Sequence, residues 1–195
     1  DGIRDDLVTG VQTCALPISC LSVCLFLLAP LSAEAAVFAK YDGIDGESSR
    51  DANHDKWIDV LSIDWGMHRP GGGATGQSRR RGGAVVEDVT LTIEYDKASP
   101  KIQESLLRGE VIPKLEIEQT ANYGGARAVY LKYELKNVLI TSISVNASGD
   151  DDAGPPTVVV GNNFEEIKVT YTEYDSAGNS RGNVEYSWKV EEGAK

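Results

Sequence analysis

Cysteine is scarce in this chain, and its position matters more than its number. The 195 residues contain three cysteines, Cys14, Cys20 and Cys24, and none follows residue 24. The rest of the chain therefore has no disulfide, no thiolate nucleophile and no cysteine metal ligand. A domain built from it must be stabilised by its hydrophobic core or by association with other chains.

Histidine and positive charge are also in short supply. Neither His54 nor His68 has a glutamate or a second histidine at helical ligand spacing, so a zinc site is not supported, and we expect both at the surface. The net charge of −11 argues against general nucleic-acid binding, which needs a basic footprint. No serine sits in a nucleophile elbow, and nothing places two carboxylates across a cleft. We therefore expect that this protein is not an enzyme and that it binds no cofactor.

The chain also has no hydrophobic run long enough to span a bilayer, which needs about 20 apolar residues. Residues 1–19 back-translate into a common sequencing-library adapter and are excluded from fold reasoning. The apolar run from Leu21 to Ala29, followed by Pro30 and the Ala33-Glu34-Ala35 cleavage pattern, predicts a signal peptide over residues 20–35. A buried first strand or helix is the alternative.

Removal of residues 1–35 leaves one predicted domain, residues 36–195. Four of the acidic residues and one arginine lie in the removed part, so 26 acidic and 18 basic residues remain. This length is sufficient for one domain with a substantial core, without membrane insertion once the leader is removed.

What the domain does contain is alternation of apolar and polar residues, the period of a half-buried strand. It predicts apolar faces made of Val85, Val89, Leu91, Ile93 and Tyr95, of Val184, Tyr186, Trp188 and Val190, and of Trp57, Leu61, Ile63, Trp65 and Met67. Further strands are expected over residues 36–41, 113–119, 128–145 and 165–174. The segment 128–145 is one bent strand or two, with a bulge at Asn137.

One short helix interrupts the strands. Ser99 is the expected N-cap, Pro100 the first helical residue and Gly109 the stop, with Ile102 and Leu106 on one face. Strands with a single small helix predict a mainly β fold, either a closed barrel or two packed antiparallel sheets.

Two long loops, residues 69–83 and 146–157, stand between the strands, and such loops are often functional. The first is Gly-rich but lacks the GK[ST] ending of a phosphate loop. Its arginines, Arg79, Arg80 and Arg81, fit a solvated loop, a nucleic-acid patch or a contact to an acidic neighbouring subunit. The subunit contact is the functional interpretation we prefer, because the chain offers many carboxylates for arginine to meet.

The most specific candidate for a ligand-binding site in the sequence is a calcium-binding loop. Asp51, Asn53 and Asp55 occupy its first, third and fifth positions, and Ile58 occupies the apolar eighth. Position six is Lys56 where glycine is required, and position twelve is Ser62 where a bidentate glutamate is required. We therefore favour a solvated acidic turn, while a calcium-stabilised extracellular β domain stays as an alternative.

From about Val37 to Val190 the chain resembles the Hcp (haemolysin-coregulated protein) family of bacterial type VI secretion. The match is carried, in order, by "FAKYDGIDGES", "IDVLSIDWGM", the long Gly-rich loop, "VEDVTLTIEYDKASPKIQESLLRGE" and "VEYSWKV". The resemblance implies an Hcp-like β-barrel of two packed sheets with one helix. It implies homohexameric rings with a wide pore that stack into a tube, propelled by a sheath.

The resemblance also implies partners and one site. The partners are other copies of the chain and the type VI spike, sheath and effector proteins, the last as cargo in the lumen. The loop from Pro70 to Gly83 corresponds to a segment that reaches the neighbouring subunit. Its expected contact residues are Pro70, Gly71, Gly72, Gly73, Arg79, Arg80, Arg81, Gly82 and Gly83.

The leader departs from the family pattern, because tube proteins of this kind are loaded from the cytoplasm. A genuine leader predicts a secreted, extracellular protein, and otherwise a tube loaded from the cytoplasm is expected. An exported Hcp-like binding module without a tube role is the alternative function.

Overall fold

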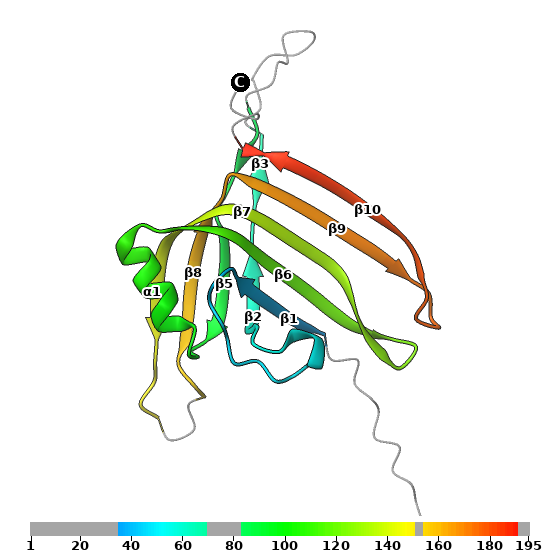
Figure 1. Cartoon of the computed structure of the whole chain (residues 1–195), viewed down its shortest axis with the longest axis horizontal. Helices are drawn as coiled ribbons and strands as arrows, with labels where there is room; N and C mark the ends of the chain where they lie inside the picture. The colour runs from blue at the N-terminus through cyan, green and yellow to red at the C-terminus, as the bar shows by residue number, and fades with distance from the viewer. Residues whose placement is uncertain (1–34, 70–82, 151–153, 191–195) are drawn as a thin grey trace, which may run out of the picture. The chain divides into compact units, whose positions relative to one another are not determined.

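The structure, a computed structural model, describes residues 35–69, 83–150 and 154–190 of the chain. The strands are β1 (Ala36–Tyr41), β2 (Ile58–Asp64), β3 (Met67–His68), β4 (Val85–Val86), β5 (Val89–Glu94), β6 (Val111–Tyr123), β7 (Ala126–Asn146), β8 (Thr157–Asn163), β9 (Glu166–Tyr174) and β10 (Ser180–Lys189). The helices are the 3-10 turn η1 (Ala52–His54) and α1 (Ser99–Arg108) (Figure 1). Among the described residues, no helix has the length and apolar character needed to cross a membrane.

Six of the strands form a closed barrel. The eight-stranded antiparallel sheet runs in the order β10-β9-β7-β6-β1-β2-β5-β8, and a further pairing of β7 with β8 closes it. The predicted mainly β barrel with one short helix is therefore confirmed, and one continuous hydrogen-bonded sheet forms both of its sides. Closure removes the free edges of the barrel strands.

The strand β7 exchanges one neighbour for another at Asn137. Residues 131–136 of β7 pair with β9, and residues 139–146 pair with β8, on the same edge. Asn137 itself has a left-handed φ of 51°, which asparagine tolerates better than most residues. The long segment is thus one strand that changes neighbours at Asn137, but the bulge predicted at this residue is not found there. The register shifts lie elsewhere, next to Thr120 and between Ile140 and Ser142.

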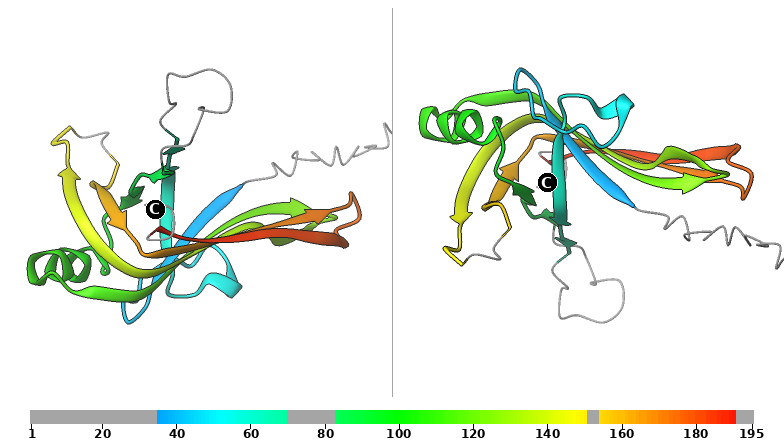
Figure 2. Two further views of the ribbon diagram at one scale, coloured as in Figure 1. Left: turned by 90° about the horizontal axis from the view of Figure 1, so that it is seen from above. Right: turned by 90° about the horizontal axis from the view of Figure 1, so that it is seen from below.

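The exchange leaves part of the sheet outside the barrel. We call this part the wing: β9, β10 and residues 118–136 of the β6–β7 hairpin. In Figures 1 and 2 the wing extends to one side, and α1 lies on the opposite side of the barrel. α1 packs against β7 and buries Ile102, with Leu106 partly buried.

The ends of α1 differ slightly from expectation. Ala98 occupies the N-cap position and Ser99 is the first helical residue, so the predicted N-cap is wrong by one residue. The capping acceptor is the Asp96 carboxylate, which receives the N–H groups of Ala98 and Ser99 at 3.0 and 3.2 Å. The predicted stop is confirmed, because Gly109 has a φ of 63°, where a side chain would be strained.

Two strand predictions need correction. In β2 the buried residues are Ile58 and Val60, whereas Leu61 is 49% exposed, because the pairing with β5 shifts between Val60 and Ser62. The bulge exchanges the two faces within one strand. Val85 belongs to the short strand β4 rather than to β5, whose residues Val89, Leu91 and Ile93 are buried as expected.

The strand β8 was not predicted from the sequence. Its residues Val158 and Val160 are buried, and Asn162 is fully buried among them. Tyr41 Oη donates a hydrogen bond to Asn162 Oδ1 at 2.8 Å across the barrel interior, while the Asn162 amide donates to the carbonyls of Val89 and Val160. Burial raises the pKa of the Tyr41 hydroxyl well above its usual value.

The Tyr41–Asn162 hydrogen bond gives a test of this core. We expect Tyr41→Phe to lower the free energy of unfolding by about 1–2 kcal/mol, since a buried amide oxygen is left unpaired. Tyr130→Phe is the matched control, because Tyr130 Oη donates to Gln119 Oε1 at the same 2.8 Å in a half-buried position. It should cost less than about 0.5 kcal/mol. Urea denaturation measures both, and equal losses would contradict the buried bond.

Candidate functional site

The inner face of the barrel sheet continues onto the wing. Directly opposite residues form rows across neighbouring strands, and the two rows that leave the barrel are apolar apart from Gln119. One row runs Ala39, Ile117, Tyr133, Val169, Tyr186, and the next runs Val37, Gln119, Leu131, Tyr171, Val184. Inside the barrel this face is covered by the opposite wall, but on the wing no strand or helix of the described residues lies opposite it.

The result is an exposed apolar surface, which we call the wing face. It comprises Leu131, Tyr133, Val169, Tyr171, Val184 and Tyr186. Val184 is 76% exposed, and Tyr171 and Tyr186 are each 46% exposed. The predicted alternation of β10 is thus correct, although Val184 and Tyr186 are exposed and only Trp188 of this strand packs against the core. Contiguous exposed apolar side chains of this kind are typical of interaction sites.

A pocket of about 320 Å³ lies at the root of the wing face. Its lining is Trp65, Met67, His68, Arg69, Ala84, Val86, Ile167, Tyr186 and Trp188. Trp65 contacts Tyr133 edge-on, with ring centroids 6.0 Å apart. The indole N–H groups of Trp65 and Trp188 are buried and find no hydrogen-bond partner among the described residues. Such unpaired buried donors are uncommon in native protein cores.

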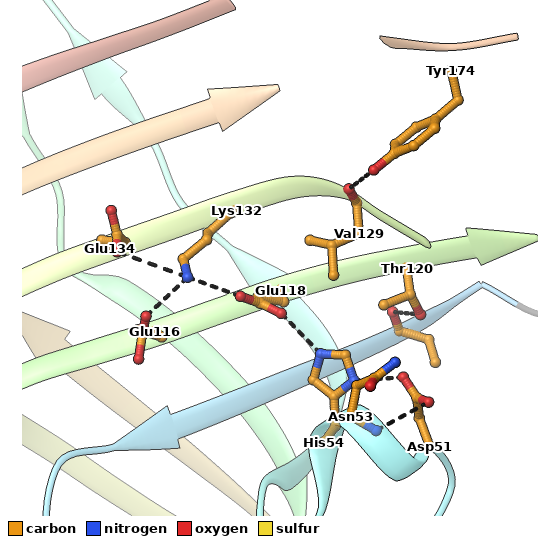
Figure 3. A network of polar contacts seen from close by, with 11 residues as sticks. Asp51, Asn53, His54, Glu116, Glu118, Thr120, Val129, Lys132, Glu134 and Tyr174 are labelled. Atoms are coloured by element: carbon orange, nitrogen blue, oxygen red, sulfur yellow. Dashed lines mark hydrogen bonds and ion pairs between the residues drawn. The ribbon is translucent and has the colours of Figure 1, made fainter. Parts of the chain in front are cut away.

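The opposite face of the wing is charged and internally paired (Figure 3). Lys132 Nζ lies 2.9 Å from a carboxylate oxygen of Glu116, 2.9 Å from one of Glu118 and 3.8 Å from one of Glu134. Although partial burial works against its charge, the hydrogen bonds that Lys132 donates to Glu116 and Glu118 hold the pKa of Lys132 well above its usual value. Lys168 and Glu185 make a further pair at 3.0 Å.

His54 connects this charged face to the β1–β2 connection. Its Nδ1 lies 2.6 Å from Asp51 Oδ2, and its Nε2 lies 2.9 Å from Glu118 Oε2. The imidazole stacks on Phe38 at 4.2 Å and meets Trp57 edge-on at 4.9 Å. Both ring nitrogens thus lie within hydrogen-bond distance of a carboxylate oxygen, so His54 bridges Asp51 and Glu118.

The prediction of a surface position for His54 is therefore wrong, since only 2% of it is exposed. Asp51 is not a solvated turn residue either, because its carboxylate also caps η1 by accepting from the Asn53 N–H at 3.4 Å. The second carboxylate, Glu118, is 64 residues away in sequence and no local pattern points to it. His68 is confirmed at the surface, 3.5 Å from Glu87 Oε1.

The polar environment of Asp51 alters its acidity. Burial works to raise the pKa of the Asp51 carboxyl, but the hydrogen bonds from His54 and the Asn53 N–H, with the nearby charges of His54 and Arg127, lower it overall. Asp51 is thus engaged by His54 rather than directed at a metal. Within residues 35–69, 83–150 and 154–190 no group of three or more potential ligands is arranged around a metal position.

The predicted subunit-contact loop is only partly described. Pro70, Gly71, Gly72, Gly73, Arg79, Arg80, Arg81 and Gly82 lie outside the described residues, as do residues 1–34 with the expected adapter segment and most of the leader. Gly83 is described and precedes β4. The strands that flank the loop pair with each other, Met67 with Val86 and His68 with Val85. The two ends of the loop therefore leave the barrel side by side, next to the pocket.

Comparison with known proteins gives one consistent family. Residues 38–171 match the model described as "Type VI secretion system effector, Hcp". Protein hcp1 of Pseudomonas aeruginosa is 29% identical over 155 residues, which cover 79% of this chain and 94% of that protein.

Solved structures agree with that family. A structure described as a type six secretion system protein has a TM-score of 0.75 at 25% identity, covering 82% of this chain and 98% of its own. The crystal structure of Hcp1 from Salmonella typhimurium has a TM-score of 0.63 at 25% identity, covering 82% and 96%.

The two contacts of His54 predict a large stability cost for the loss of its imidazole. His54→Leu leaves Asp51 and Glu118 facing an apolar side chain, so we expect the free energy of unfolding to fall by about 2–4 kcal/mol near neutral pH. His68→Leu is the matched control and should change it by less than about 0.5 kcal/mol, because His68 is exposed. Chemical denaturation of both variants compares the two sites. A loss of the same size in both would show that His54 is not held as described.

The lowered pKa of Asp51 predicts an acid-sensitive contribution to stability. A carboxyl whose pKa is lower in the folded state stabilises the fold above its unfolded pKa of about 3.9, and this contribution disappears as pH falls through the folded pKa. We expect the stability of Asp51→Asn to fall less than that of the wild type as the pH is lowered below about 4. Denaturant titrations at several pH values measure the difference, and parallel pH profiles would refute it.

Proposed function

Because the chain belongs to the Hcp family and is a tube subunit of the type VI secretion system, we propose that six copies close into a ring and that rings stack into the tube. The proposed role is structural, without a catalytic step. Its partners are further copies of the chain, and beyond them the spike, sheath and effector proteins of the system.

The observation that supports the ring is the wing face. An apolar sheet surface that leaves a closed barrel and stays uncovered needs a partner. The four strand segments of the wing are spaced about 4.8 Å apart and are on average about nine residues long, so they present about 600 Å² on one face. A stable interface buries about 800 Å² per partner, so the wing face supplies a large part of one contact.

The edge of the wing favours the same conclusion. β10 pairs with β9 along one side, and no described strand pairs with its other side. An unpaired edge of ten residues invites association with another chain, which natural proteins control. A neighbouring subunit seated against the wing would cover both the apolar face and this edge. The loop from Pro70 to Gly83 remains a proposed second contact, because its ends leave the barrel beside the pocket.

The proposed ring is compatible with both routes of export. As a member of a secretion-system family the protein is a secreted one. A cleaved leader over residues 20–35, ahead of one domain at residues 36–195, would direct it through general export. Without a functional leader it would be loaded into the tube from the cytoplasm.

A face-specific pair of variants tests the ring. Val184 and Asn183 are adjacent exposed residues of β10 on opposite faces of the wing. We expect native mass spectrometry of the full chain to show a hexamer, which Asn183→Lys preserves. Val184→Lys should dissociate it, because a buried, unpaired ammonium group opposes association. A wild-type chain that stays monomeric at high micromolar concentration would refute the ring.

A further inference from the structure

A second apolar patch lies away from the wing. We call it the flank patch, and it consists of Leu107, Val111 and Leu139. Leu107, in the last turn of α1, is 83% exposed, the highest value among the large apolar side chains of the described residues. Val111, which is 59% exposed, pairs directly with Leu139 of β7, which is 37% exposed.

The fold of the single chain does not require this patch. α1 is amphipathic, and its buried contacts are made by Ile102, with Leu106 partly buried. Leu107 points away from that face, where a charged residue would serve the helix equally well. Its neighbours illustrate the point, since Lys101 and Arg108 both pair with Glu104 on the helix surface. Apolar residues gathered on such a charged surface indicate a contact with another molecule.

The position of the flank patch suits a ring. A closed ring uses a head-to-tail interface, so each subunit presents two different patches to its two neighbours. α1, which carries Leu107, lies on the opposite side of the barrel from the wing in Figures 1 and 2. Among the described residues, exposed apolar side chains thus lie on both of these sides of the barrel.

The two patches also differ in shape. Leu107 protrudes from a helix end, as its exposure shows. The wing face has at its root the apolar pocket of about 320 Å³, lined by Trp65, Tyr186 and Trp188 among others. The pocket has room for an aliphatic side chain.

We infer that the flank patch of one subunit packs on the wing face of the next, with Leu107 directed at the pocket between Trp65 and Trp188. This inference rests on the proposed ring. The occupant of the wing face is then a second copy of this chain, presented by the C-terminal end of α1 and the start of β6. The estimated 600 Å² of the wing face matches a contact between folded surfaces better than the insertion of a short peptide.

Complementation between two variants tests this pairing. Leu107→Lys removes the flank patch and keeps the wing face, whereas Val184→Lys does the reverse. We expect each variant of the full chain to lose the hexamer, with the subunit contact weakened roughly ten- to hundredfold. An equimolar mixture retains one intact contact, between the flank of the Val184 variant and the wing of the Leu107 variant. It should therefore give a heterodimer in native mass spectrometry and no ring.

Leu61→Lys is the matched control, because Leu61 is also an exposed leucine but belongs to neither patch. It should keep the hexamer, and circular dichroism should show all three variants folded. If Leu107→Lys keeps the hexamer, the inference is overturned while the ring stands. If both variants dissociate and their mixture stays monomeric, another segment or another protein occupies the wing face, and the inference is again overturned. A monomeric wild type refutes the ring itself.

Discussion

The exchange of neighbours along β7 is the constraint on which the rest of this fold depends. One edge of a single strand must serve β9 first and β8 afterwards, so the chain has to turn a corner between Asn163 and Glu166. Several hydrogen bonds hold that corner. Asn137 Nδ2 donates to Glu165 Oε2 at 2.6 Å, Glu165 N–H donates to the Lys136 carbonyl, and Val190 N–H donates to the Glu165 carbonyl. Without this exchange the barrel would stay open, and no part of the sheet would project from it as a wing.

The side chains on the two faces of the wing differ in whether they find partners within the same chain. On the charged face lysines and glutamates pair with one another, so these charged side chains already have partners within one chain. On the apolar face nothing in the described part of the chain covers Val184 or Tyr171. Subunits with a net charge of −11 repel one another, and only apolar burial or specific pairing offsets that repulsion. We therefore expect the favourable free energy of assembly to come from burial of the apolar face.

Periodicity predicted the strands of this fold better than it predicted their surroundings. Alternation identified β5 and β10, and Gly109 marked the helix end correctly. The bulge predicted at Asn137 lies elsewhere, although the strand changes its neighbour at that residue. Alternation cannot show which face is covered, so Val184 looked like Leu91 although one is exposed and the other buried. It also fails at a bulge, as at Leu61. β8 was missed because Gly161 and two asparagines resemble a turn, whereas Asn162 is buried by its hydrogen bond to Tyr41.

Local sequence patterns also could not predict the environment of His54, because its partner Glu118 is 64 residues away. This environment affects how the wing is held for assembly. His54 and Asp51 belong to the β1–β2 connection, but Glu118 belongs to β6 near the point where the wing leaves the barrel. Glu118 is in turn bound by Lys132 of β7, so one charged chain of contacts joins the connection to both inner strands of the wing. Fixing these strands reduces the conformational freedom that a neighbouring subunit would otherwise have to remove on binding. A contact buried on the charged face thus favours association through the apolar face, because it holds the wing in one orientation before a partner arrives.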